Sequence, residues 1–414
     1  MYFLAVLNRT TLGVAGLTAE RRFHITPAQL SVFVLLQIGV YAIMQIPSGL
    51  LADRYGPRRM LFAAALVMGL AQLAFAEIDS YPVALLARAF LGGGDSMTFI
   101  AVLRLIAARF PVRRYPMFVG LTSTIGQVGN LVATLPLTLL LRDVGWASTF
   151  AVAGALSLAV GVAVWLLLDD RSARPARTRG AAQVRRGAAS IRGRIEQAWS
   201  APGTRLGFWV HCSAAVPTTL LVLWGHPYLV KGAGFSDAAA SSVLLMAVVF
   251  TACGSLAVGS IMVRRPQLRA PMALGQCVAT FLAWALLLGV FSGRPPQALV
   301  IAVFAISALG GPASLIAFSL TRDFSPHRTL GTASGLVNTA GFTGVIIASL
   351  SIGAILDIVG GSAPGDYRRA FTVLVVVEAV VTLKIALWTR RMHAISAPPP
   401  TAPLGRRRAT ARTR

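Results

Sequence analysis

Long apolar segments separated by short polar turns recur along the whole of this 414-residue chain. Each segment is close to the roughly 20 residues that a helix needs to cross the hydrocarbon core of a bilayer. Membrane barrels use strands of about 10 residues that alternate in polarity, so this pattern excludes a barrel. We therefore predict twelve transmembrane helices, at 1–17, 28–52, 60–77, 82–104, 117–141, 147–168, 206–230, 240–263, 270–291, 297–320, 331–356 and 370–389.

A hydrophilic interval divides these helices into two groups of six. It is rich in Arg, Ala, Gly and Ser and has too little apolar content to bury a core, although one amphipathic turn is expected near Ile191–Trp199. The sequence thus predicts a six-helix bundle, a basic cytoplasmic linker, a second six-helix bundle and a disordered Pro/Arg tail. Their expected ranges are 1–168, 169–205, 206–392 and 393–414.

The composition agrees with a membrane protein. Hydrophobic residues make up 56% of the chain and charged residues only 13%, whereas a soluble domain carries about 25% charged residues. The net charge of +24 raises the question of nucleic acid, but 28 cationic residues fall on one side of the predicted membrane and seven on the other. This positive-inside pattern predicts that both termini are cytoplasmic. It indicates a lipid bilayer as the partner of these charges, and no nucleic acid.

The sequence lacks the patterns that would indicate an enzyme. Its three cysteines, Cys212, Cys253 and Cys277, fall within predicted helices without metal-binding or redox spacing, and we expect them to pack as small apolar residues. No Walker-type phosphate loop, histidine–acid metal constellation or nucleophile elbow is present in the sequence. We predict no enzymatic activity, no metal site and no cofactor.

One charged turn between two apolar segments is distinctive. It reads G-L-L-A-D-R-Y-G-P-R-R from Gly49 to Arg59 and resembles G-x-L-x-D-R-x-G-x-R-R, the loop signature of the major facilitator superfamily. The resemblance implies an all-α membrane protein, with twelve transmembrane helices in two pseudo-symmetric six-helix bundles. It also implies a cytoplasmic gate motif, made here by Gly49, Asp53, Arg54, Gly56, Arg58 and Arg59.

Asp53 is the central residue of this motif. In the superfamily the matching aspartate stabilises the outward-facing state against the start of helix eleven, which corresponds here to Thr329–Thr332. At the end of helix two its charge can cap a neighbouring helix N-terminus. We also expect it to pair with a nearby arginine of the turn, Arg58 or Arg59.

Charges inside the membrane are costly, so each is a functional candidate. The run from Arg88 to Gly94 resembles the superfamily's R-x-x-x-G-x-G motif, whose arginine is linked to proton coupling. Asp95 lies seven residues after Arg88 on the same helical face, but two turns, about 10 Å of rise, separate the two. We interpret Arg88 and Asp95 as proton-coupling candidates; a purely structural ion pair is the alternative.

Arg9 is a third intramembrane charge. The run from Asn8 to Ala15 resembles the D-R-x-x-L-x-x-A pattern of organic-anion members of the superfamily, with Asn8 in place of the acid. In those members the arginine faces the substrate cavity. Three interpretations stay open: Arg9 binds an anion, it pairs with Asp95 and holds helices one and four together, or its side chain extends to a membrane interface. Because the predicted first helix is short for a span, we also expect the native start to lie upstream of Met1.

Polar side chains at helical spacing indicate a central cavity. Gln37, Tyr41, Gln45 and Ser48 form one stripe of the second helix, and the weak similarity between the halves aligns Gln127 with Asn338. The substrate-cavity candidates are Arg9, Gln37, Tyr41, Gln45, Gln127 and Asn338. Glycines allow close packing of helices in lipid, and the candidates for this role are Gly92, Gly94, Gly126 and Gly129.

The sequence therefore predicts a secondary active transporter of a small solute, working by alternating access as a monomer in a bacterial inner membrane. The expected coupling partner is a proton or another ion, and the candidate solutes are organic or inorganic anions. One alternative is an efflux antiporter for drugs or metabolites, although the fifth helix lacks the G-x-x-x-G-P-x-x-G-G string of drug antiporters. Another is a membrane sensor that uses the same fold without transport.

Overall fold

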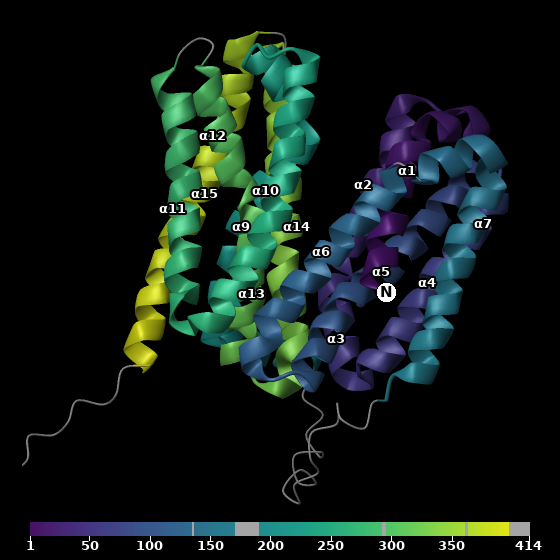
Figure 1. The fold of residues 1–414 in the computed structure, drawn as a ribbon, viewed down its shortest axis with the longest axis horizontal. Helices are drawn as coiled ribbons and strands as arrows, with labels where there is room; N and C mark the ends of the chain where they lie inside the picture. The colour runs from purple at the N-terminus through teal and green to yellow at the C-terminus, as the bar shows by residue number, and fades with distance from the viewer. Residues whose placement is uncertain (135, 170–189, 292–294, 361–362, 397–414) are drawn as a thin grey trace, which may run out of the picture.

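The computed structural model describes residues 1–134, 136–169, 190–291, 295–360 and 363–396. Residues 170–189 of the expected linker and 397–414 of the expected tail lie outside these ranges. Every regular element within the described ranges is a helix. The helices gather into two bundles, which Figure 1 shows side by side.

The helices that precede the linker form the first bundle, coloured purple to blue in Figure 1. They are α1 (Tyr2–Phe23), α2 (Pro27–Ile43), α3 (Gln45–Tyr55), α4 (Pro57–Glu77), α5 (Tyr81–Arg109), the short η1 (Val112–Arg114), α6 (Tyr115–Thr134) and α7 (Pro136–Leu167). Thr26 is the N-cap of α2: its side chain accepts from the Gln29 N–H, and the Gln29 side chain accepts from the Thr26 N–H. This capping box satisfies two backbone donors.

Two breaks in this bundle follow from proline and glycine. The second span bends by 47° between α2 and α3, because Pro47 has no N–H to donate to the carbonyl four residues earlier. Within α7, Gly145 has a φ of +79°, a conformation that suits glycine. Gly145 separates 136–144 from 146–167, so the prediction that one helix ends before 147 and another follows is confirmed.

The first helix differs from its prediction. α1 continues through Arg21 and Arg22 to Phe23 and has 22 residues, instead of ending at residue 17. Its end is stabilised by the two arginines of the last turn, which face the negative pole of the helix dipole. The helix is therefore long enough to cross a bilayer, and the prediction of a short first helix was wrong.

The helices that follow the linker form the second bundle, coloured teal to yellow in Figure 1. They are α9 (Pro202–Pro227), η5 (Tyr228–Gly232), α10 (Asp237–Arg264), η6 (Pro266–Leu268), α11 (Arg269–Val290), α12 (Gln297–Ala308), α13 (Gly310–Phe324), η7 (His327–Thr329), α14 (Leu330–Val359) and α15 (Pro364–Ser396). The expected amphipathic turn of the linker is a ten-residue helix, α8 (Ile191–Ser200).

Nine helices of the described ranges are long and apolar enough to cross a membrane, or ten when the bent α2–α3 pair counts as one span. The remaining two long helices, α1 and α6, have 22 and 20 residues and pack against each other in the first bundle. The described helices thus provide twelve segments of membrane-spanning length. α1 contains three charges in its last turns and Arg9 near its middle, which lowers its mean hydropathy.

The two bundles meet at the end where α7 stops and α8 starts, which we call the linker end (Figure 1). There α3 packs along α14, and α6 packs along α10. Glycines bring the backbones together: a Cβ placed on Gly49 would lie 2.9 Å from the Thr332 Cα. At the opposite end the ribbons of the two bundles diverge (Figure 1). The contacts between the bundles are therefore concentrated at the linker end.

Candidate functional site

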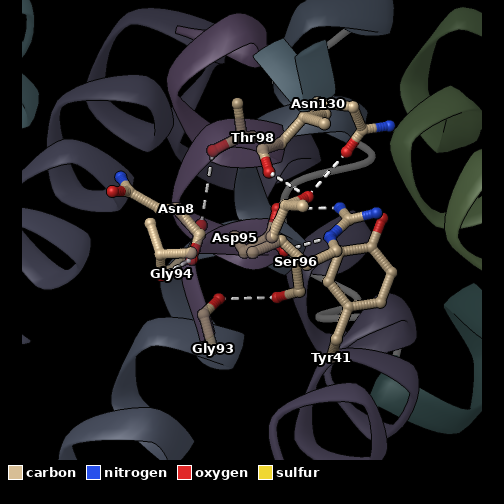
Figure 2. A network of polar contacts seen from close by, with 12 residues as sticks. Asn8, Tyr41, Gly93, Gly94, Asp95, Ser96, Thr98 and Asn130 are labelled. Atoms are coloured by element: carbon tan, nitrogen blue, oxygen red, sulfur yellow. Dashed lines mark hydrogen bonds and ion pairs between the residues drawn. The ribbon is translucent and has the colours of Figure 1, made fainter. Parts of the chain in front are cut away.

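Arg9 of α1 and Asp95 of α5 form an ion pair inside the first bundle (Figure 2). The guanidinium binds both carboxylate oxygens, with an Nε–Oδ2 distance of 2.7 Å and an Nη2–Oδ1 distance of 2.9 Å. Such a two-point contact is among the strongest polar contacts in proteins. The Asp95 side chain is 2% exposed and that of Arg9 29% exposed. The carboxylate is thus enclosed, while part of the guanidinium stays accessible.

The ring of Tyr41 on α2 packs against the Arg9 side of this ion pair. The Arg9 Cζ lies 4.7 Å from the centroid of the buried Tyr41 ring, within the range of a cation–π contact. The Arg9 Nη1 donates no hydrogen bond to any described residue. The guanidinium is therefore oriented by a carboxylate and an aromatic ring, with one donor group left for a further acceptor.

Asn338 of α14 carries the polar network into the second bundle. Its Nδ2 donates to the Tyr41 Oη at 3.3 Å and to the Gln45 Oε1 at 2.7 Å. Its Oδ1 lies 3.1 Å from the Nε2 of His211 on α9. Consecutive contacts thus link the ion pair to a histidine of the other bundle.

His211 belongs to this network, although sequence reasoning did not select it. It is buried, and its Nδ1 has no hydrogen-bond partner among the described residues. The available signal was a titratable side chain within an otherwise apolar segment. The sequence could not show that His211 faces Asn338.

The remaining cavity candidates, Gln127 and Gln37, lie on α6 and α2. Asn130 of α6 accepts from the Thr10 hydroxyl at 2.6 Å and donates to the Gln127 Oε1 at 2.9 Å, and Figure 2 shows it next to the ion pair. Gln127 is exposed and makes no described contact with Asn338. Gln37 is buried, and its Nε2 has no hydrogen-bond partner among the described residues.

Arg88 lies apart from the ion pair. Its side chain is 1% exposed, and its Cζ stacks 3.9 Å from the centroid of the Phe75 ring. The Nη1 donates to the Thr11 hydroxyl at 3.3 Å, whereas Nε and Nη2 have no partner among the described residues. As their separation along the helix predicts, Arg88 and Asp95 form no described contact.

The packing glycines face neighbouring helices. A Cβ on Gly92 would lie 3.2 Å from the carbonyl carbon of Gln37, and a Cβ on Gly129 would lie 2.6 Å from the Phe3 carbonyl oxygen. Gly94 packs against the Met68 side chain and Gly126 against the Tyr2 ring. These contacts hold α5 against α2 and α4, and α6 against α1.

Asp53 joins the bundles at the linker end. Its carboxylate accepts from the backbone N–H groups of Gly331 at 2.9 Å and Thr332 at 2.8 Å, and from the Thr332 hydroxyl at 2.7 Å. A carboxylate at this position satisfies unpaired donors of α14 and complements the helix dipole. The gate aspartate thus caps a helix of the other bundle.

The predicted pairing of Asp53 with Arg58 or Arg59 was wrong. Its cation is Arg104 of α5, whose Nη1 lies 2.6 Å from the Asp53 Oδ1. Arg58 points toward α7 instead, where it donates to the Trp165 carbonyl and stacks on that ring at 4.3 Å. The reason is the sharp reversal at Gly56, which has a φ of +83° and turns the start of α4 away from α3. Of the other gate residues, Arg59 is exposed and Arg54 stacks on Tyr55.

Arg322 of the second bundle caps a helix of the first bundle, at its C-terminal end. Its Nη2 donates to the carbonyl oxygens of Ala107 and Phe110 at 3.1 Å each, at the end of α5. A cation at a helix C-terminus is favourable for the same reason that an anion is favourable at an N-terminus. One helix end of each bundle is therefore capped by a charge from the other bundle.

We expect Asp53→Asn to lower the melting temperature of the purified protein, because an amide replaces charged hydrogen bonds, worth about 1.5–3 kcal/mol each, and removes the partner of Arg104. Thermal unfolding in detergent measures this change. Asp143→Asn is the control, since the Arg142–Asp143 pair is 76% and 57% exposed and exposed pairs contribute about 0–1 kcal/mol. Equal melting temperatures for both variants would contradict a stabilising cap.

The arrangement of long apolar helices defines a multi-pass membrane protein. More narrowly, the chain belongs to the Major Facilitator Superfamily, whose family model matches residues 1–349. This confirms the resemblance that the gate motif indicates.

Two relatives illustrate the likeness at the level of sequence. SauU of Cupriavidus necator, named as a sulfoacetate transporter, is 28% identical over 168 residues, which cover 41% of this chain and 38% of SauU. GudP of Escherichia coli, named as a galactarate/D-glucarate transporter, is 22% identical over 389 residues, which cover 85% of this chain and 84% of GudP. The chain thus matches well under half of SauU but most of GudP.

Solved structures show the same fold. FucP in the outward conformation has a TM-score of 0.67 at 16% identity, with 94% of this chain and 96% of FucP covered. The proton:xylose symporter XylE has a TM-score of 0.65 at 15% identity, with 93% of each chain covered. At these identities the comparison concerns the fold alone. It confirms the predicted all-α fold.

Proposed function

We propose that this protein is a secondary active transporter that carries a small organic anion together with a proton. The observation that carries the proposal is the two-point pairing of Arg9 with the enclosed Asp95. The Arg9 side chain is itself partly exposed, so its guanidinium can also contact a solute. Relatives named for organic acids support the class of solute: their names give sulfoacetate, galactarate or D-glucarate, L-galactonate and tartrate.

The ion pair provides a way to couple the two ligands. While Asp95 is charged, it neutralises Arg9 and occupies its hydrogen-bonding fork. A proton on Asp95 removes that charge and leaves a guanidinium with no anion beside it in a site of low dielectric, which is unfavourable. A carboxylate or sulfonate of the solute restores the neutralised pair. Proton and anion therefore favour each other's binding, and this mutual effect is the coupling free energy.

The contacts between the bundles suit alternating access. We place the linker end in the cytoplasm of a bacterial inner membrane, with both termini on that side, because basic residues concentrate there. The Asp53 and Arg322 caps then close the cytoplasmic side, and the solute reaches Arg9 from the opposite side. The halves 1–168 and 206–392 rock about the central site in a monomer. Breaking the two caps opens the cytoplasmic side.

The internal pH of proteoliposomes tests this proposal. Pools of organic anions, inorganic anions, sugars and cationic drugs are added in turn to vesicles containing wild type or Arg9→Gln. We expect the organic-anion pool alone to move protons. Arg9→Gln should reduce that signal at least about 100-fold, since it removes two charged hydrogen bonds to the solute. Arg142→Gln, which changes an arginine that is 76% exposed, should leave the signal unchanged.

Drug or metabolite efflux is the second candidate. A quinolone resistance transporter of Acinetobacter baumannii is 27% identical over 177 residues. If cationic drugs move protons, and Arg9→Gln leaves this signal intact, the result would favour the efflux function and show that Arg9 has a structural role. Solute binding without movement of solute or protons across sealed vesicles would instead indicate a membrane sensor. Either result would overturn the proposal of proton-coupled anion transport.

A further inference from the structure

A group of aromatic and cationic side chains lies at the linker end of the second bundle, away from the central site. It is contributed by three helices that end or begin at this level: α8, α9 and α15. We call it the tryptophan–cation cluster, and it consists of Trp199, Arg205, Trp209, Lys384, Trp388 and Arg391. Neither the gate motif nor the transport site uses any of these side chains.

Arg205 is fixed at the centre of the tryptophan–cation cluster. Its Cζ lies 5.7 Å from the ring centroid of Trp199 and 5.1 Å from that of Trp388. Its Nε also donates to the Trp199 carbonyl at 2.8 Å. Two rings and one hydrogen bond thus hold the guanidinium in place, so that little side-chain entropy remains to be lost when it binds a ligand.

A second arginine, Arg391, also stacks on the Trp388 ring. The Arg391 Cζ lies 4.9 Å from the same ring centroid. The Cζ atoms of Arg205 and Arg391 are therefore no farther apart than the sum of their distances to this ring. This upper limit is close to the Debye length at physiological salt, about 8–10 Å, so salt screens the two charges from each other only in part. Lys384 adds a third cation, with its Nζ 6.0 Å from the Trp209 ring.

No carboxylate within the described residues pairs with these three cations. The carboxylates nearest in sequence are engaged elsewhere: Glu196 pairs with Arg192, and the buried Glu378 accepts from the Ser213 hydroxyl. Three cations without a carboxylate partner give this surface a net positive charge, which attracts an anion. The tryptophan–cation cluster therefore has the charge and the geometry of an anion site.

The surroundings of the cluster identify the source of the anion. Leu383 and Leu387 of α15 are 60% and 45% exposed, next in sequence to Lys384 and Trp388. Tryptophan is enriched where the hydrocarbon core meets the headgroups, and basic residues at this depth attract anionic lipid. We propose that the tryptophan–cation cluster binds the phosphate of an anionic phospholipid, whose acyl chains lie along the exposed leucines of α15. This inference does not depend on the transported solute.

Native mass spectrometry of the full chain tests the proposal, with phosphatidylglycerol or phosphatidylcholine supplied in equal amounts. We expect wild type to retain phosphatidylglycerol preferentially. Arg205→Gln and Arg391→Gln should each weaken its retention about fivefold, the effect of one basic residue near an anionic surface. Arg264→Gln and Arg265→Gln are the matched controls, because both are exposed arginines at the linker end that stack on no ring among the described residues, and both should retain the lipid as wild type does.

Three outcomes would overturn the assignment. One is equal retention of both lipids by wild type, and another is an equal loss of phosphatidylglycerol in the cluster variants and the controls. The third is displacement of phosphatidylglycerol by inorganic phosphate or glycerol phosphate at similar concentration, which would indicate a site for a soluble anion. Arg391 is exposed near the end of α15, so Arg391→Gln tests the site even if Arg205→Gln disturbs packing.

Discussion

Asp95→Asn is expected to abolish proton movement while solute exchange across the membrane continues. Asparagine has nearly the shape of the protonated aspartate and carries no charge, so Arg9 is left permanently without its carboxylate partner. The anion site then stays available at every pH, but no group at position 95 can release a proton. Internal pH and counterflow of labelled solute, recorded on the same proteoliposomes, separate the two processes.

Asp143→Asn is the matched control for this experiment. It removes the same carboxylate from an exposed ion pair, and both proton movement and counterflow should match wild type. Proton flux in Asp95→Asn within about twofold of wild type would show that the proton is carried elsewhere. His211, at the other end of the network, would then be the group to replace. A loss of counterflow together with proton flux would show that the ion pair is needed for the structure of the site.

The outcome at Arg9 shows where sequence reasoning reached its limit. Apolar length and intramembrane charge select Arg9 and Asp95, because charges in a bilayer are rare and costly. Whether they touch depends on the rotation of α1 against α5, which neither motif specifies. The sequence therefore identified both partners and left their pairing open. The structure shows the pair and leaves 29% of the Arg9 side chain exposed.

The gate shows a related limit. The motif located Asp53 and its contact with the start of α14, but not the cation, because Arg58 is closer in sequence and Arg104 is closer in space. Arg322 was missed for another reason. When the two halves are aligned, Val263 stands at the position of Asp53 and is followed by Arg264 and Arg265, so the alignment suggests no carboxylate at the corresponding turn. The second cap comes instead from the end of α13, with the opposite sign and toward a helix C-terminus.

Helix breaks were visible in the sequence but not interpreted. Pro47 and Pro312 lie inside segments predicted as continuous, and the structure breaks both segments three residues earlier, at Met44 and Leu309. A proline N cannot donate to the carbonyl four residues before it. The bend at Met44 separates the half of the second span that carries Tyr41 from the half that packs more extensively on α14. One proline thus lets a single span serve both the central site and the gate.

Gly335→Val is expected to hold the two bundles apart at the linker end. A Cβ at Gly335 would lie 3.1 Å from the Gln45 carbonyl carbon and 3.4 Å from the Ile46 Cα, and its shortest contact would be with the Gln45 carbonyl oxygen. These are backbone atoms of α3, so no side chain can rotate away, and overpacking costs about 1–3 kcal/mol. Because 1.4 kcal/mol is a factor of ten in population, the population of the closed arrangement should fall about five- to 140-fold relative to that of the open one.

Spin labels at Arg59 and Arg328, which are exposed on opposite bundles at the linker end, report this change when the exposed Cys253 is replaced by serine. Gly335→Val should move the distance distribution to longer values and reduce transport at least about tenfold, because the cycle requires both states. Gly275→Val is the matched control: it makes the same substitution within a helix, and a Cβ there meets no atom within 4 Å. If both variants keep the wild-type distribution, the close contact of α3 with α14 does not close the linker end. If Gly335→Val alone shifts it while transport is unchanged, closure at the linker end is not a step of the transport cycle.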